Sequence, residues 1–180
     1  MRFKLKPLIL LFILPFFISC VDNADFDQIN LDIDPIINTP LVYFELDQLD
    51  FLEDTGAERI TVSDITDVDI FQSTTIRDNL ERMDLIINIR KDFPRGFRVD
   101  VTLLDDNLNP TYEFGDILFS STTTEVDFRE NVDVIANPGV LNTTKMLVEL
   151  SLLGTSGTPI DADVEWELEF RSVGVFYLSF

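Results

Sequence analysis

Apolar and polar residues alternate one by one in three segments of this sequence. The clearest is VEWELEF at 164–170, where Val164, Trp166, Leu168 and Phe170 alternate with three glutamates. Because successive side chains of a β-strand point to opposite faces, a period of two predicts strands with one face buried and the other in water. The other two segments place their apolar residues inward in the same way: Met83, Leu85, Ile87 and Ile89 in MDLIINIR, and Phe97, Val99, Val101 and Leu103 in FRVDVTLL.

Further segments have the composition of strands, and turn residues separate them. They cover 41–46, 58–62, 67–71, 111–119, 125–135, 145–153 and 173–180. The breaks carry Gly, Pro, Asn or Asp, as in EDTG, KDFPRG and ANPG, which favour chain reversal. Only 76–83 has the pattern of a helical turn. Many short strands with regular turn signals predict an all-β fold, an antiparallel sandwich of two sheets.

The chain begins with a basic and then strongly apolar leader. Three basic residues precede the unbroken apolar stretch 8–18, which is the layout of an export signal. The stretch is too short for a spanning helix, which needs about 20 apolar residues. Ser19 and Cys20 resemble the cleavage site of bacterial lipoproteins. The resemblance implies that the signal peptide, residues 1–19, is removed and that Cys20 is acylated and holds the protein on a membrane. The alternative is an accidental thiol beside a cleavage site elsewhere.

The residues after the cysteine bear on location. Val21 stands where many enterobacterial lipoproteins of the inner membrane carry Asp, so we expect a lipid anchor in the outer membrane. Asp22 and Asp25 are similar to the short acidic tag that directs lipoproteins of the Bacteroidota to the cell surface. We expect 20–40 to be an acidic tether and 41–180 to be one β-sandwich domain, facing the periplasm or the cell surface.

The charge excludes one class of partner. The chain has 13 basic and 33 acidic residues, a formal net charge of −20. Removal of residues 1–19 takes away three basic residues and no acidic ones, which leaves 10 − 33 = −23. Nucleic acid requires a basic footprint, so we expect no nucleic-acid partner. A hydrophobic content of 46% also excludes a disordered chain.

One continuous stretch carries a family resemblance. TTIRDNLERMDLIINIRKDFPRGFRVDVTLLDDNLNP, residues 74–110, contains a lead-in, a strand, a corner with Phe93 and Pro94, a second strand and an acidic turn. Together with the leader and the tether, it resembles small lipoproteins of the Bacteroidota that carry an immunoglobulin-like domain. The resemblance implies an immunoglobulin-like β-sandwich and an envelope location, and it implies no activity.

The residue types limit the chemistry. Histidine is absent and the single cysteine is expected to be acylated, which excludes a Ser-His-Asp triad, a Cys-His pair and the ordinary zinc or copper sites. Two carboxylates across a cleft could hydrolyse a glycoside, but acids are so numerous that no pair stands out. We therefore expect no catalytic residue, no cofactor and no enzyme activity, and a carboxylate-dependent hydrolase is the last alternative.

One acidic loop has part of a calcium-binding pattern. Asp105, Asn107 and Asn109 alternate as calcium ligands do, and Asp116 occupies the twelfth position. Pro110 replaces the glycine that the sharp turn requires, and the terminal Glu is missing. We favour a plain hairpin loop, with Asp and Asn as turn formers, and expect no metal site here.

Two functional classes remain. The first is a binding or structural module in adhesion or envelope complex assembly, with another envelope protein as partner. The second is a carbohydrate-binding accessory lipoprotein, with a glycan as partner. An unpaired apolar edge strand or an exposed apolar patch would favour the first, and exposed aromatic residues in a shallow groove the second. Trp166 could be a platform for a sugar, but its place on an apolar strand face favours the core.

Overall fold

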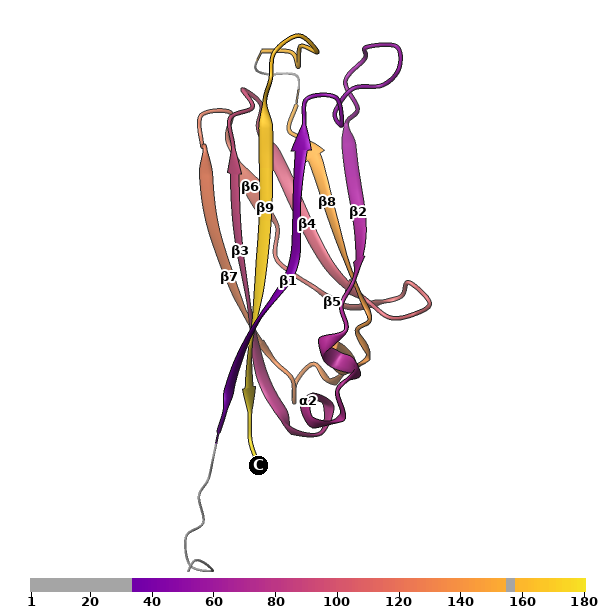
Figure 1. The fold of residues 1–180 in the computed structure, drawn as a ribbon, viewed down its shortest axis with the longest axis vertical. Helices are drawn as coiled ribbons and strands as arrows, with labels where there is room; N and C mark the ends of the chain where they lie inside the picture. The colour runs from indigo at the N-terminus through magenta and orange to yellow at the C-terminus, as the bar shows by residue number, and fades with distance from the viewer. Residues whose placement is uncertain (1–33, 155–157) are drawn as a thin grey trace, which may run out of the picture. The chain divides into compact units, whose positions relative to one another are not determined.

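The computed structural model describes residues 34–154 and 158–180, and these form a sandwich of two antiparallel sheets (Figure 1). Sheet I has the order β1 (Ile36–Asp47), β9 (Glu167–Leu178), β3 (Leu80–Lys91) and β7 (Glu125–Asp133). Sheet II has the order β2 (Thr61–Asp67), β8 (Lys145–Leu152), β4 (Phe97–Leu104) and β5 (Pro110–Glu113), and β6 (Ile117–Phe119) also pairs with β4. The prediction of an all-β, two-sheet antiparallel sandwich is confirmed.

The strands are connected as one long hairpin that is rolled into a sandwich. β1 pairs with β9, β2 with β8, β3 with β7, and β4 with β5 and β6, so the chain pairs from its two ends inward. Successive pairs alternate between sheet I and sheet II, which is the arrangement of a jelly roll. An immunoglobulin-like sheet would place the first strand beside the second. The connectivity therefore differs from the immunoglobulin-like one that the resemblance implies, because period-two alternation carries no information on strand order.

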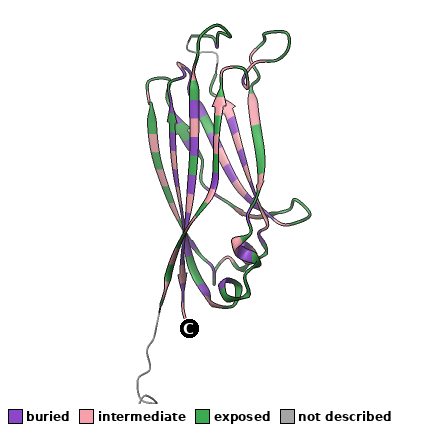
Figure 2. Cartoon of the chain, viewed as in Figure 1, coloured by how far each residue is buried: buried purple, intermediate pink, exposed green. Residues whose placement is uncertain are grey.

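The inner faces of the two central strands agree with the sequence pattern. Every predicted inward residue of 83–89 and 97–103 is at most 1% exposed. Figure 2 shows the resulting alternation of buried and exposed positions along the strands. Phenylalanine supplies much of the core volume, and seven of these side chains are fully buried: Phe51, Phe71, Phe93, Phe97, Phe119, Phe170 and Phe176.

Three segments differ from expectation. No strand forms at 68–71: β2 ends at Asp67, and a 3-10 turn, η3 (Ile70–Gln72), follows. Phe71 of this turn and Val68 just before it are buried. The expected helical turn begins earlier, as α2 (Thr74–Asn79), and a second 3-10 turn, η4 (Pro138–Asn142), precedes β8. Val164, expected inside, is 40% exposed because β9 begins only after it.

Strand β1 begins at Ile36, before the domain boundary expected at residue 41, and it contains a β-bulge. Leu41 and Val42 together lie opposite the single residue Ser172 of β9. A bulge leaves backbone groups without a ladder partner. The Ser172 hydroxyl replaces that partner, because its Oγ accepts a hydrogen bond from the Val42 N–H at 3.0 Å and lies 3.3 Å from the Val42 carbonyl oxygen, to which it donates.

This contact gives a testable prediction for stability. We expect Ser172→Ala to lower the free energy of unfolding by about 1–3 kcal/mol, because the buried Val42 N–H would lose its partner. Ser63→Ala, at an exposed position of edge strand β2, is the control and should change it by about 0.5 kcal/mol or less. Urea denaturation measures both. A loss at Ser172 no larger than that at Ser63 would contradict the role of the hydroxyl.

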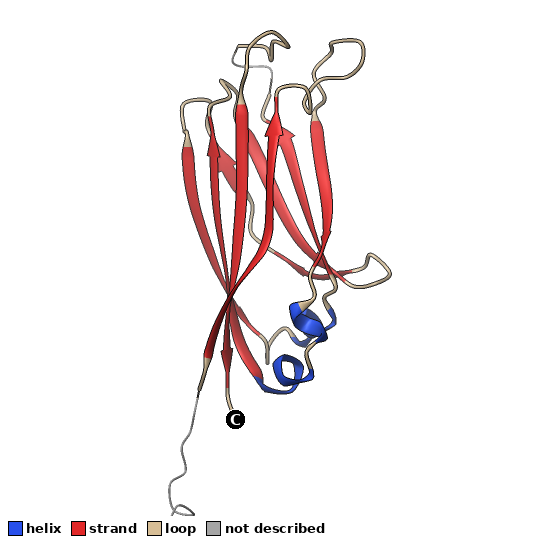
Figure 3. Ribbon diagram, in the orientation of Figure 1, coloured by secondary structure: helices blue, strands red, loops and turns tan. Residues whose placement is uncertain are grey.

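The two ends of the sandwich differ. β1 enters at the end that also holds the short helices and the C-terminal residue Phe180 (Figure 3). The opposite end, called the loop end below, holds the connections 48–60, 92–96, 120–124 and the described parts of 153–166 (Figure 1). A partner could therefore contact the outer face of either sheet, the end with the short helices or the loop end.

A buried ion pair joins three of the connections at the loop end. The Arg95 side chain is 3% exposed, its Nη1 donates to Glu58 Oε1 at 2.5 Å, and its Nη2 donates to the Gly154 carbonyl oxygen at 2.6 Å. Glu58 Oε1 also accepts from the Ile160 N–H at 2.8 Å. The pair thus links the β1–β2, β3–β4 and β8–β9 connections above the core.

Candidate interaction surface

Arginine side chains gather on the outer face of sheet I. Alternation places Arg82 and Arg90 of β3, Arg129 of β7 and Arg171 of β9 on the side away from the core. Three of these side chains are roughly half exposed, at 45% for Arg82, 59% for Arg129 and 57% for Arg171. The chain has only 13 basic residues, so this concentration sets the face apart from the rest of an acidic surface.

Asp84 lies at the centre of a cluster on this face. Although its side chain points outward, Asp84 is only 2% exposed. Its Oδ1 accepts a hydrogen bond from Asn131 Nδ2 at 2.5 Å, and its Oδ2 accepts from the Arg129 guanidinium and from the Tyr177 hydroxyl at 3.1 Å. Arg82 Nε is 3.8 Å from Oδ1. These five residues, the Asp84 cluster, come from three neighbouring strands.

The cluster determines the pKa of the Asp84 carboxyl. Burial by itself would raise this pKa, but the hydrogen bonds from Arg129, Asn131 and Tyr177 outweigh burial and hold it below its usual value. A carboxyl whose pKa is lower in the folded than in the unfolded protein adds stability above its unfolded pKa. That contribution is lost as the pH falls through the folded pKa.

We therefore predict a pH-dependent difference between the wild type and Asp84→Asn. The difference in free energy of unfolding should be constant above about pH 5 and should shrink as the pH falls below about 4. Urea denaturation at a series of pH values measures it. Asp116→Asn, which removes an exposed carboxylate paired with Arg98, is the control and at neutral pH should change the free energy of unfolding by about 0.5 kcal/mol or less. A difference for Asp84→Asn that does not vary with pH would contradict the assignment.

Arginine side chains cover two tyrosine rings on the same face. The Arg82 guanidinium carbon lies 3.7 Å from the centre of the Tyr177 ring, and that of Arg171 lies 5.7 Å from the centre of the Tyr43 ring. Both arrangements are favourable cation–π contacts. Arg171 also pairs with Glu169. The Arg82 contact occupies one face of the Tyr177 ring, and Tyr43 remains 57% exposed.

An apolar stripe runs beside these groups. Ile86 of β3, Val173 of β9 and Pro40 of β1 are successive cross-strand neighbours on the outer face. Val175, the next outward residue of β9, is only 8% exposed, and Ile36 lies opposite Tyr177. Ile36 is 57% exposed. Apolar residues in the middle of a solvent-facing sheet, framed by arginine and tyrosine, are a surface that another protein could cover.

The sequence pattern did not reveal this surface. Alternation places Asp84 on the outer face, but its burial depends on side chains from β7 and β9 that are distant in the sequence. The register of the three strands brings them together. The only sequence signal is that Arg129, Asn131 and Tyr177 occupy outward positions of their own strands.

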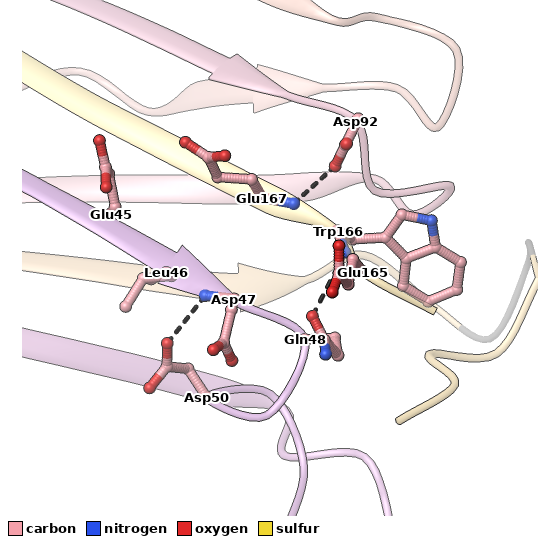
Figure 4. Close-up of a pocket in the computed structure, with 9 residues that line it drawn as sticks. All are labelled: Glu45, Leu46, Asp47, Gln48, Asp50, Asp92, Glu165, Trp166 and Glu167. Atoms are coloured by element: carbon pink, nitrogen blue, oxygen red, sulfur yellow. Dashed lines mark hydrogen bonds between the residues drawn. The ribbon is translucent and has the colours of Figure 1, made fainter. Parts of the chain in front are cut away.

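A second feature is an acid-rimmed hollow at the loop end (Figure 4). It is lined by Glu45, Leu46, Asp47, Gln48, Asp50, Asp92, Glu165, Trp166 and Glu167. Two carboxylates order the backbone here: Asp50 Oδ2 accepts from the Asp47 N–H at 2.9 Å, and Asp92 Oδ1 accepts from the Glu167 N–H at 2.6 Å. Across residues 34–154 and 158–180, no three acidic side chains are placed to hold a metal ion.

Trp166 lies at the margin of the hollow and is half buried. Its ring centre is 5.9 Å from that of Phe93, and its backbone N–H donates to Gln48 Oε1 at 3.3 Å. The residue therefore packs on the core through one side and keeps the other at the surface. Trp166 is therefore neither a fully buried core residue, which the sequence favoured, nor a fully exposed platform for a sugar.

The acidic loop at 105–110 is a hairpin loop. The Asn109 side-chain amide donates to Asp105 Oδ2 at 3.0 Å, and the backbone N–H groups of Asn107 and Asn109 each donate to Oδ1 at 2.8 Å. These bonds, that from the Asn109 side chain most, lower the pKa of Asp105. Leu108 takes a positive φ of 63°. Asp116 lies elsewhere and pairs with Arg98 at 3.3 Å. The four residues do not converge on a common point, so the calcium pattern reflects turn formation.

Cys20, the predicted lipidation site, lies outside the described residues, as do the signal peptide and tether residues 21–33. Within the part of the chain that the structure describes, no helix has the length and apolar character needed to cross a membrane.

Fold and surface together define a jelly-roll sandwich whose outer face carries arginine, tyrosine and aliphatic side chains. No family model matches the sequence, and no curated protein matches it. Solved structures that are similar include a protein from Parabacteroides distasonis described as secreted, at 10% identity and a TM-score of 0.48, over 63% of this chain and 37% of that one.

Two viral proteins are also similar. The VP2 subviral particle protein of infectious bursal disease virus is 8% identical with a TM-score of 0.46, over 81% of this chain and 33% of that one. A Desmodium yellow mottle tymovirus chain is 12% identical with a TM-score of 0.36, over 83% and 84%. This chain spans 37% and 33% of the length of the bacterial and VP2 proteins. Likenesses this distant carry no argument about function.

Proposed function

We propose that the protein is a lipid-anchored component of the bacterial cell envelope that acts as a binding or structural module in adhesion or in the assembly of envelope complexes. The observation that carries the proposal is the outer face of sheet I, where arginines and tyrosines frame a partly exposed apolar stripe. Tyrosine and arginine are enriched at protein interfaces and among the residues whose truncation weakens binding most. Such a face supports recognition of another protein surface.

A carbohydrate-binding accessory lipoprotein is the second candidate. The Arg82 guanidinium covers one face of the Tyr177 ring at 3.7 Å, whereas Tyr43, with the Arg171 guanidinium 5.7 Å from its ring centre, is 57% exposed and remains open to a ligand. Trp166, half buried beside polar side chains at the loop end, is the observation that favours a glycan. Trp166 is the single tryptophan of the sequence, so its fluorescence reports on that place alone. A saturable change on titration with soluble oligosaccharides would move this candidate to the front.

The carboxylates of the hollow also allow a proposal about catalysis. Glu45, Asp47, Glu165 and Glu167 are exposed to solvent. A catalytic carboxyl of a glycosidase is normally tuned by burial or by a close carboxyl partner. We therefore propose no enzyme activity, cofactor or metal for this chain.

The anchor is supported by the sequence. The apolar leader ends at Ser19 and Cys20, and Cys20 is the single cysteine of the chain. Acylation at this position would hold the domain on the outer membrane, facing the periplasm or the cell surface, because several acyl chains together give stable membrane attachment.

Replacing the cysteine tests the anchor. We expect full-length wild-type protein to sediment with membranes and to enter the detergent phase on partitioning, and we expect Cys20→Ser to lose the label of a supplied fatty acid. Ser19→Ala, which keeps a small residue before the cysteine, is the matched control and should remain labelled. Equal fatty-acid labelling of wild type and Cys20→Ser would show that the anchor lies elsewhere.

A further inference from the structure

The central part of the outer face of sheet I carries no net charge. This neutral patch consists of the outward-facing residues in 36–43 of β1, 171–177 of β9, 82–88 of β3 and 127–133 of β7. Its charged members are three arginines and three aspartates: Arg82, Arg129, Arg171, Asp84, Asp127 and Asp133. The chain as a whole has a formal charge of −20, which opposes self-association. Two copies can therefore approach through this patch without the repulsion that the overall charge would cause elsewhere.

The register of β3 and β9 makes the patch complementary to itself. A two-fold axis parallel to the strands and midway between β3 and β9 would place each residue of β3 opposite the second copy of its own cross-strand neighbour. Those neighbours on the outer face include Arg82 with Tyr177 and Ile86 with Val173 inside the patch, and Arg90 with Glu169 just beyond it. Each of these three opposed pairs would then join compatible groups: a guanidinium with an aromatic ring, two aliphatic side chains, and two opposite charges. Asp84, which would lie opposite Val175, is already hydrogen-bonded within its own copy.

The size of the face indicates a weak interface. Packed sheets lie about 10 Å apart and their strands cross at about 30°. The two copies of the sheet would therefore align best near Ile86. Towards the strand ends, where the crossing moves opposed residues apart, long arginine side chains can still span the distance. Four strands about 4.8 Å apart, over about nine residues, give a face of about 19 by 30 Å, or about 570 Å² per copy. A standard stable interface buries about 800 Å² per partner.

We propose that the outer face of sheet I is the interface of a weak two-fold homodimer, in which a second copy of this chain covers the neutral patch. A second copy fits this face because the groups required opposite Arg82, Ile86 and Arg90 are already present on it. The axis also leaves both β1 entry points at the same end of the dimer, so two lipid anchors could share one membrane. The shared membrane rests on the proposed anchoring, which would raise the local concentration of the protein. The interface itself does not depend on the anchoring.

Cross-linking of the full chain in membranes tests the proposal. Two copies of Ile86→Cys would lie about 10 Å apart across the axis, within reach of a short bis-maleimide. Thr102→Cys, at a half-buried outer position of central strand β4 in sheet II, is the matched control. We expect several-fold more product of twice the monomer mass from Ile86→Cys than from Thr102→Cys. The wild type corrects for any reaction through Cys20, its single cysteine.

A second variant keeps the test independent of misfolding. Arg90→Glu at an exposed position would place glutamates opposite each other across the axis, so adding it to Ile86→Cys should reduce the dimer several-fold while the Tm stays close to that of the parent. Equal products from Ile86→Cys and Thr102→Cys, or none from either, would overturn the proposal. An adduct of another mass from Ile86→Cys would identify a different occupant and would also overturn it. If fractionation places the protein outside the membrane, the same measurement on purified full chain still tests the interface.

Discussion

Truncating Ile87 to alanine should lower the free energy of unfolding by about 2–5 kcal/mol. Ile87 is 0% exposed on the inner face of β3, the strand that lies between β9 and β7. The loss combines the removed apolar burial with the cavity that remains, and a central strand held on both sides has little freedom to close it. Urea denaturation of the wild type and the variant gives the difference.

The matched control is Asp100→Ala on the outer face of β4. Its carboxylate is 31% exposed and pairs with Arg98 at 2.9 Å, and exposed pairs of this kind contribute about 0.5 kcal/mol or less. Comparable losses at Ile87 and Asp100 would mean that the inner and outer faces are exchanged, because a shift of one residue in register inverts every side chain.

Replacing Glu58 with methionine should lower the free energy of unfolding by about 3 kcal/mol. The Arg95 guanidinium, 3% exposed, would remain buried without its carboxylate. The lower end of the range for buried pairs applies because the Glu58 side chain is 28% exposed. The Ile160 N–H would also lose its acceptor. The double variant Glu58→Met/Arg95→Met should recover part of the loss, since no unpaired charge remains.

An exposed pair is the control for Glu58. Asp116→Asn removes the charge opposite Arg98, where both side chains are about half exposed, at 55% and 46%, and it should change stability by about 0.5 kcal/mol or less. If Glu58→Met were no more damaging than Asp116→Asn in the same denaturation experiment, the ion pair would not be what links the loop-end connections.

The inner faces of the strands could be predicted because they depend only on local pattern. Ile87 and Val101 occupy the positions that alternation assigns to them, since an apolar residue every second position has one face to bury. The segment 67–71 shows the limit of this argument. Two alternating apolar residues are too few to distinguish a strand from a 3-10 turn. Whether this segment forms a turn or a strand depends on how Val68 and Phe71 fit into the core between the sheets.

Strand order and the candidate site could not be predicted, because both depend on contacts between distant segments. Nothing local distinguishes a first strand that pairs with the second from one that pairs with the last. The burial of Asp84 likewise depends on Arg129 and Tyr177, which reach it only in the observed register of β3 with β7 and β9. From its outward position in β3, Asp84 would be predicted to be exposed. It is buried because side chains of β7 and β9 cover it.

The pairing of the first strand with the last has a consequence for biogenesis. The hydrogen bond from Val42 to Ser172 joins residues 130 positions apart, and β9 is the inner neighbour of β1 in sheet I. A chain that leaves the ribosome or a secretion channel from its N-terminus keeps β1 without its partner until β9 has emerged. Distant pairing of this kind makes folding slow. Sheet I can therefore be completed only after β9 has emerged, and until then β1 has no strand to pair with.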